Sequence, residues 1–101
     1  MDKATQRVGS LNRRKAELKA RHWETWSAVK RAVDGADPEG LLAMGCPNNE
    51  YDDAVVFLAD RVLEGGPLGA ESLSAWFQNR YGSVPDAKAV QLIVMSLGGM
   101  S

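Results

Sequence analysis

The chain has 101 residues, of which 45% are hydrophobic, and a net charge of −1 at pH 7. This length allows one hydrophobic core, so we expect a single domain over residues 1–101. Its longest apolar run, Ala54 to Ala59, is much shorter than the roughly 20 residues that cross a bilayer, and no apolar signal core follows Met1. The single cysteine, Cys46, excludes an internal disulfide and suits a reducing compartment. We therefore expect a cytoplasmic protein with no membrane partner.

The first predicted helix runs from Ser10 or Asn12, both competent N-caps, to about Asp34, because no Gly or Pro interrupts this stretch. Its second half carries a stripe of apolar and semi-apolar residues at helical spacing, and should pack on a core. Its first half has little to bury. We therefore divide the chain into a basic N-terminal extension, residues 1–25, which projects, is mobile or meets another chain, and a helical core, residues 26–98. The stripe consists of Leu18, His22, Trp26, Val29 and Val33.

Charge is divided unevenly between this first helix and the rest of the chain. Residues 1–31 carry nine Lys and Arg against three Asp and Glu, whereas residues 32–101 carry three against ten. Either the basic helix lies against the acidic remainder or is simply solvated, or it binds a partner. Trp23 is expected at the edge of the bundle; if exposed, it adds an aromatic contact of the kind enriched at interfaces. The candidate interaction surface comprises Arg13, Arg14, Lys15, Lys19, Arg21 and Trp23.

A corner of the chain follows, in which helix-stopping and helix-starting residues are adjacent. Asp37-Pro38 starts a short helical turn over residues 38–44, and Gly45 ends it in a left-handed conformation. The next helix should start at Asn48 or Asn49, with carboxylates in its first turn, where the helix macrodipole favours them. We expect a structural role for the residues of this corner: Asp37, Pro38, Gly40, Gly45, Pro47, Glu50, Tyr51 and Asp52.

Three further helices are predicted. They run to about Glu64, from about Ala70 to Tyr81, and from the capping-box pattern Ser83-Val84-Pro85-Asp86 to about Gly98. The fold class is therefore all-α, a small bundle of three to four helices with a long basic N-terminal helix. The expected core residues of the three helices are Val55, Phe57, Leu58, Ala59, Val62 and Leu63, then Leu73, Trp76, Phe77 and Tyr81, then Val90, Val94 and Leu97.

The corner carries a resemblance to a known family. The run Asp37-Pro38-x-Gly40-Leu41-Leu42, followed by Gly45-x-Pro47-x-x-Glu50-Tyr51-Asp52, resembles a small bacterial family called domain of unknown function 1871. The resemblance covers roughly residues 26–97 and implies an all-helical fold with no assigned activity. The family favours Ala and Asp where this chain has Cys46 and Asn49. The basic N-terminal 25 residues lie outside it.

Three function classes remain open. The leading one is a non-enzymatic protein–protein interaction module, which could also associate with itself through the first helix. The second is binding of nucleic acid or an acidic partner through the basic helix. The third is a small enzyme that uses Glu50, Asp52 or Asp53 from the acidic cluster at positions 50–53.

No cofactor or metal is expected. The acidic residues at positions 50–53 lack the alternating ligand pattern of a calcium loop, and one histidine with one cysteine cannot form a structural zinc site. A nucleophile pair of Cys46 and His22 is conceivable, because two residues distant in sequence can be close in space. Cys46 is more simply explained as a small buried filler, and Tyr51 as a buried ring whose hydroxyl reaches a polar group.

Overall fold

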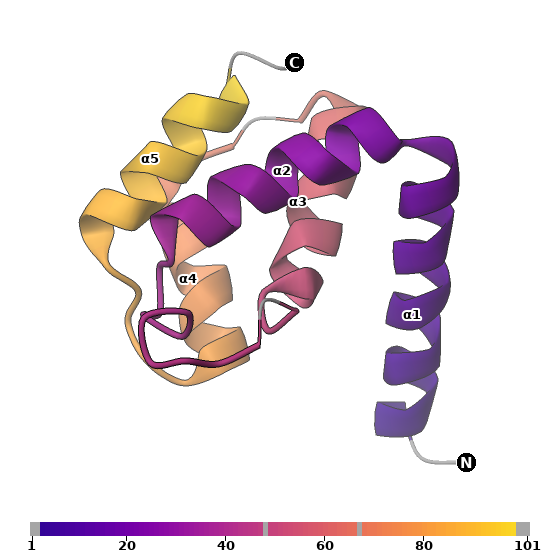
Figure 1. The fold of residues 1–101 in the computed structure, drawn as a ribbon, viewed down its shortest axis with the longest axis horizontal. Helices are drawn as coiled ribbons and strands as arrows, with labels where there is room; N and C mark the ends of the chain where they lie inside the picture. The colour runs from indigo at the N-terminus through magenta and orange to yellow at the C-terminus, as the bar shows by residue number, and fades with distance from the viewer. Residues whose placement is uncertain (1–2, 48, 67, 99–101) are drawn as a thin grey trace.

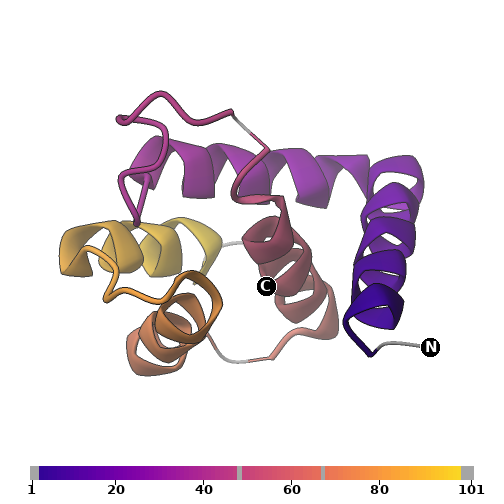
Figure 2. The same ribbon diagram turned by 90° about the horizontal axis from the view of Figure 1, so that it is seen from below.

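The computed structural model describes residues 3–47, 49–66 and 68–98, with side chains from residue 11 onward. Within this part the chain forms helices and no strand, which confirms the predicted all-α class. Figures 1 and 2 show α3 in the interior, with α2 crossing it, α1 on one flank, and α4 and α5 on the other. The helices are α1 (Lys3–Arg21), α2 (Trp23–Ala36), α3 (Asp52–Glu64), α4 (Ala70–Tyr81) and α5 (Ala87–Gly98).

The predicted long basic helix is divided into α1 and α2, which raises the number of described helices to five. The break is at His22, whose φ of −132° and ψ of 48° are not helical. Its N–H still donates to the Leu18 carbonyl at 2.8 Å and its carbonyl still accepts from Trp26 at 2.9 Å, so the bend keeps these backbone bonds. Both Leu18 and Trp26 are buried. If α1 and α2 formed one straight helix, the 19 residues of α1 would project about 28 Å from the end of α2, at 1.5 Å per residue. Leu18 would then be exposed.

The start of α1 also differs from the prediction. The helix begins at Lys3, so Ser10 and Asn12 lie inside it and do not cap it. Leu18 is fully buried and Leu11 is partly buried against the core, while α1 packs along α3. The described part of the basic extension is therefore docked on the body. Of the interpretations of the uneven charge, this is the one in which the basic helix lies against the acidic remainder of the chain.

The core is centred on α3, which buries side chains on most of its circumference because it is surrounded by α1, α2 and the corner loop. Leu63 is an exception to the predicted stripe: it is exposed near the end of α3. Trp76 is half-buried and stacks on Phe57 with ring centroids 4.8 Å apart. The larger buried side chains are Leu18, Trp26, Val29, Val33, Tyr51, Val55, Leu58, Leu73, Phe77, Val90, Ile93 and Leu97.

Residues 38–44 form hydrogen-bonded turns instead of a regular helix. The Gly45 N–H donates to the Leu42 carbonyl and the Cys46 N–H to the Leu41 carbonyl, both at 3.0 Å. These are the two hydrogen bonds of a Schellman ending, in which the residue at the Gly45 position is left-handed. Gly45 has a φ of 88°, as predicted.

Two predicted helix caps are wrong. Helix α3 has Tyr51 at its N-cap position, and Asn49 lies in the preceding turn; Asn48 lies outside the described residues. The predicted capping box does not form, because the Ser83 hydroxyl donates to Glu39 at 2.7 Å instead of capping α5. Asp86 caps α5, and its carboxylate accepts from the Ala89 N–H at 3.3 Å.

Candidate functional site

The predicted corner is held together by Tyr51. Its ring is completely buried, and its hydroxyl donates to Asp37 Oδ1 at 2.6 Å. The same hydroxyl accepts from the backbone N–H of Glu39 at 2.9 Å and of Leu41 at 3.4 Å. Asp37 itself has a φ of 49°. Tyr51 therefore has the structural role that its sequence context predicted. The single hydrogen of its hydroxyl is already donated to Asp37.

The Asp37 carboxylate is held in its ionised form. Burial acts to raise the pKa of this carboxyl, but hydrogen bonds from Tyr51 and from the backbone N–H groups of Leu42 and Ala43 outweigh burial, and the pKa is lowered. Burial, followed by the hydrogen bond to Asp37, raises the pKa of Tyr51. The pair therefore does not present a group that exchanges protons near neutral pH.

The remaining corner residues tie this loop to the chain before α5. Pro38 is buried and its carbonyl accepts from the Asp86 N–H at 2.8 Å, while the Tyr81 hydroxyl donates to the Glu50 carbonyl at 3.0 Å. Gly40 is left-handed, with a φ of 68°, and Pro47 is exposed. These contacts support a structural role for the corner.

The carboxylates at positions 50–53 point to different partners. Asp52 is buried and pairs with Lys15 at 2.5 Å and Lys30 at 3.0 Å. Asp53 accepts from Arg80 Nε at 2.9 Å, whereas the side chain of Glu50 is exposed. In the part of the chain that the structure describes, no three His, Cys, Asp or Glu side chains are arranged to hold a metal ion. Asp52 and Asp53 are therefore engaged in internal ion pairs, whereas Glu50 makes none with a described residue.

The two residues of the conceivable nucleophile pair are placed on different elements. His22 lies at the bend between α1 and α2, and Cys46 lies in the loop after the corner turn. No hydrogen bond joins them among the described residues. Cys46 is half-buried, so it fills the corner less completely than we predicted.

Within the candidate interaction surface, Arg14 and Lys15 are turned toward the body. Arg14 pairs with Asp60 of α3 at 2.5 Å and with Glu17 at 2.6 Å, and Lys15 pairs with Asp52. These two cations neutralise α3 carboxylates. They are thus part of the α1–α3 interface and are not free for a partner.

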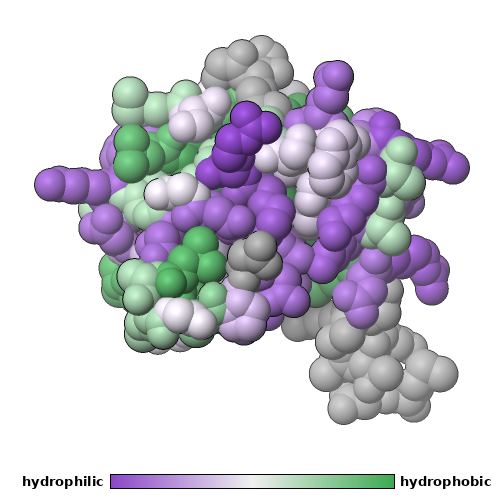
Figure 3. All heavy atoms as spheres, in the orientation of Figure 1, coloured by the Kyte–Doolittle hydropathy of each residue, from purple (hydrophilic) through white to green (hydrophobic). Residues whose placement is uncertain are grey.

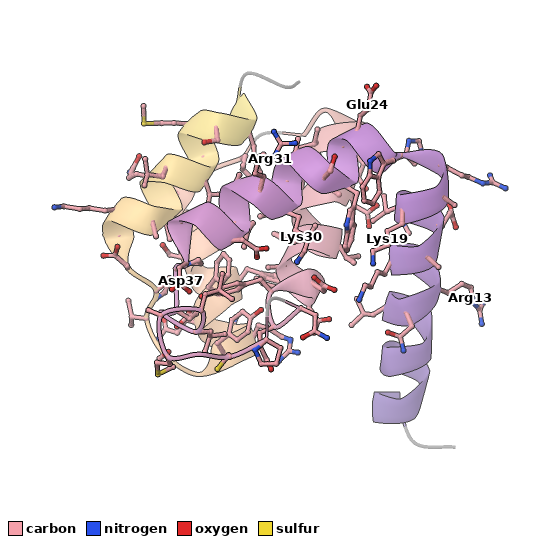
Figure 4. All side chains as sticks on the ribbon, viewed as in Figure 1. Arg13, Lys19, Glu24, Lys30, Arg31 and Asp37 are labelled. Atoms are coloured by element: carbon pink, nitrogen blue, oxygen red, sulfur yellow. The ribbon has the colours of Figure 1, made fainter. Side chains whose placement is uncertain are left out.

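The other members of that surface remain accessible. Arg13 and Arg21 are exposed and have no ion pair among the described residues, and Figure 4 shows Arg13 pointing away from the body. Lys19 points from α1 toward α2, where its Nζ lies 5.4 Å from the ring centroid of Trp26. Trp23 is 59% exposed, so its ring does not pack over the bundle edge and is open to solvent.

Trp23 borders a hollow of about 500 Å³ on the surface of α2. The hollow is lined by Trp23, Trp26, Ser27, Lys30, Arg31, Asp34 and Gly35. Their spacing places them along one side of the helix. The sequence did not single out Arg31 or the α2 hollow, although the recurrence of polar residues every three or four positions after Trp23 indicates this face.

We call the lining of this hollow, together with Lys19 and Glu24, the Trp23 surface. Its charges are mixed. Arg31 is exposed and makes no ion pair with a described residue, while Asp34 pairs with Lys30 at 3.2 Å. Glu24 follows Trp23 and projects from the same end of α2 (Figure 4). The arrangement combines an exposed aromatic ring, an apolar floor at Trp26 and a polar border.

Comparison with known proteins assigns no relative to this chain. No family model matches it, and no curated protein and no solved structure matches it. The resemblance of residues 26–97 to domain of unknown function 1871 stays a prediction. None of the described helices combines the length and apolar character needed to span a membrane.

Proposed function

We propose that this chain is a non-enzymatic interaction module that binds an acidic segment of a partner protein on the Trp23 surface. The observation that carries the proposal is the exposure of Trp23 beside a hollow that Arg31 lines, with the Lys19 ammonium over the ring of Trp26. Exposed tryptophan and arginine side chains are the residues most enriched among those that dominate binding energy at protein interfaces. An apolar side chain of the partner fits the Trp23–Trp26 hollow, while its carboxylates face the two cations.

A protein partner is favoured over nucleic acid by the mixed charge of this surface. Asp34 lines the same hollow as Arg31, and Glu24 follows Trp23 in α2. The cations of Arg14, Lys15 and Lys30 are paired with carboxylates. A nucleic-acid strand carries one phosphate per nucleotide and needs a continuous track of unpaired cations. A polar border around an aromatic centre is instead the usual composition of a protein interface.

A catalytic role receives less support. The carboxylates of Asp52 and Asp53 are paired with cations, and Tyr51 is buried with its hydroxyl engaged. An active site usually needs a group with a free face toward a cavity. The exposed Trp23 and Arg31 lie on α2 instead.

The proposal can be tested with two fluorescent probes of matched net charge, a peptide rich in Glu and Leu and a single-stranded oligothymidylate. Fluorescence anisotropy should show saturable binding of the peptide. Trp23→Ala should weaken that binding about tenfold or more, as expected for an interface anchor. Arg31→Gln should weaken it less. Lys88→Gln, which removes an exposed cation from α5, is the matched control and should leave binding unchanged.

The salt dependence of binding distinguishes a nucleic-acid ligand from an acidic peptide. Tighter binding of oligothymidylate, with an affinity that falls steeply between about 50 and 200 mM salt, would support nucleic-acid binding instead. The proposal is wrong if the peptide fails to bind at about 1 mM, which corresponds to roughly −4 kcal/mol. It is also wrong if Trp23→Ala binds the peptide as well as the parent does.

A further inference from the structure

The helix α1 is joined to the body by a single non-helical residue, His22. It lies at one edge of the molecule, beside α3 and the start of α2 (Figure 2). In Figure 3 the coloured atoms over the flank that α1 occupies in Figure 1 are mainly hydrophilic. Its leucines face inward instead, where Leu18 is completely buried and Leu11 is partly buried against the core. Helix α1 is thus an amphipathic helix docked at the edge of the core.

We propose that α1 exchanges between copies of this chain: it docks on α3 of a second copy when His22 takes up helical dihedral angles. In that state α1 and α2 form one continuous helix, and α1 projects about 28 Å away from its own body. It then cannot reach its own α3, so the surface that it covers is available only on another copy. Exchange of an identical element between copies is a low-cost route to oligomers.

The bend at His22 interrupts a stretch of sequence that suits one helix. No Gly or Pro occurs from Leu11 to Asp34. The start of a helix leaves its first N–H groups without intrahelical partners, and the side chain of His22 does not cap α2. In a continuous helix, the N–H groups of positions 23–25 would donate to the carbonyl groups of positions 19–21. Helical dihedral angles at His22 therefore add backbone hydrogen bonds in each copy.

The contacts that hold α1 in the bent chain can all be restored between copies. In a single chain, straightening at His22 would expose Leu18 and would leave the buried Asp52 with one cation fewer, which is costly. A second copy offers the same α3 surface, so Lys15 again pairs with Asp52, and Arg14 with Asp60. Exchange needs no interface that the structure does not already show within one chain. The balance between bent and exchanged chains therefore depends on protein concentration.

Substitutions at His22 test the role of the bend. The full chain is unfolded in urea, refolded at about 1 mM, and analysed by size-exclusion chromatography with light scattering. The parent should contain an oligomeric fraction. His22→Ala favours a continuous helix and His22→Gly disfavours it, while both remove the imidazole. The equilibrium constant for oligomer formation should be about tenfold or more higher in His22→Ala, because the difference in helix propensity acts once in each copy.

Complementary charge variants test the exchange itself. In Arg14→Glu and in Asp60→Arg, the α1–α3 contact places like charges together within every bent chain. When the two variants are refolded together, only exchange brings opposite charges to both contacts. An affinity tag on one variant should therefore retain the other. Arg13→Glu mixed with Asp60→Arg is the matched control, because Arg13 is exposed and makes no ion pair with a described residue, and this mixture should show less retention.

Circular dichroism follows the helical signal of every variant and mixture. A charge variant that is unfolded alone should gain helical signal when the complementary variant is added. The proposal is overturned if the parent and His22→Ala both stay monomeric after refolding at about 1 mM. It is also overturned if the complementary variants neither retain each other nor gain helical signal on mixing. Equal oligomeric fractions in His22→Ala and His22→Gly would overturn the role of the bend.

Discussion

The hydroxyl of Tyr51 donates a 2.6 Å hydrogen bond to Asp37, a residue 14 positions earlier in the chain. It also accepts from the backbone N–H groups of Glu39 and Leu41. One buried side chain therefore provides hydrogen bonds to a loop that has no regular helix of its own. This explains how the loop between α2 and α3 keeps a defined path.

Tyr51→Phe removes this hydroxyl while keeping the ring. We expect the free energy of unfolding to fall by about 1 to 3 kcal/mol, because the Asp37 carboxylate and the Glu39 N–H each lose a hydrogen-bond partner in a partly buried site. Tyr81→Phe is the matched control: its hydroxyl makes one exposed bond to the Glu50 carbonyl, and the loss should stay below about 1 kcal/mol. Urea unfolding followed by circular dichroism measures both. Equal losses in the two variants would contradict the role assigned to Tyr51.

The hydrogen bond between Tyr51 and Asp37 also predicts how the free energy of unfolding depends on pH. The folded state lowers the pKa of Asp37 below its ordinary value of 3.8, so the ionised carboxylate stabilises the fold above that pH. This contribution should be lost as the pH falls through the lower, folded-state pKa. Asp37→Asn should therefore be less stable than the parent at pH 7 and should lose less stability on acidification. Parallel pH-dependent profiles of the two proteins, recorded by urea unfolding, would contradict this prediction.

Gly45 and Gly35 provide a matched test of backbone conformation. Gly45→Val should destabilise by roughly 1 to 3 kcal/mol, because a β-branched residue is strained at a φ of 88°. Gly35 lies within α2, and a Cβ there would meet no atom within 4 Å. Gly35→Ala should therefore stabilise the protein by about 0.5 to 1 kcal/mol. Thermal and urea unfolding measure both, and a neutral Gly45→Val would show that the left-handed ending contributes nothing.

The basic helix α1 can be divided into docked and free cations. Arg14→Gln with Lys15→Gln should lower stability by about 1 to 2 kcal/mol at low salt, because Asp60 and Asp52 lose partners in the α1–α3 interface. The difference from the parent should shrink at about 500 mM salt, as screening weakens these pairs. Arg13→Gln with Arg21→Gln removes the same charge from solvent and should change stability by less than about 0.5 kcal/mol. Equal losses in the two pairs, measured by thermal unfolding at both salts, would be inconsistent with this division.

Part of the candidate site was predictable from sequence for a local reason. The left-handed Gly45 and the buried ring of Tyr51 follow from the preferences of a few neighbouring residues, and both predictions are confirmed. Trp23 was recognised as an interface candidate, but its exposure depends on where α2 meets α1. The hollow beside it was not predicted, because its depth depends on the burial of Trp26 against the core.

The sequence by itself determined that this protein is helical, where α4 begins and ends, and that Val55, Leu58 and Ala59 of α3 face inward. Helical periodicity and glycine stops act within a few residues, so these features need no tertiary contact. The tertiary structure alone decided the bend at His22, since only the bent chain buries both Leu18 and Trp26. It also decided that Arg14 is neutralised by Asp60, a residue 46 positions away, while Arg13 stays free. Neighbouring cations on one helix look alike in sequence, and only the packing of α1 on α3 separates them.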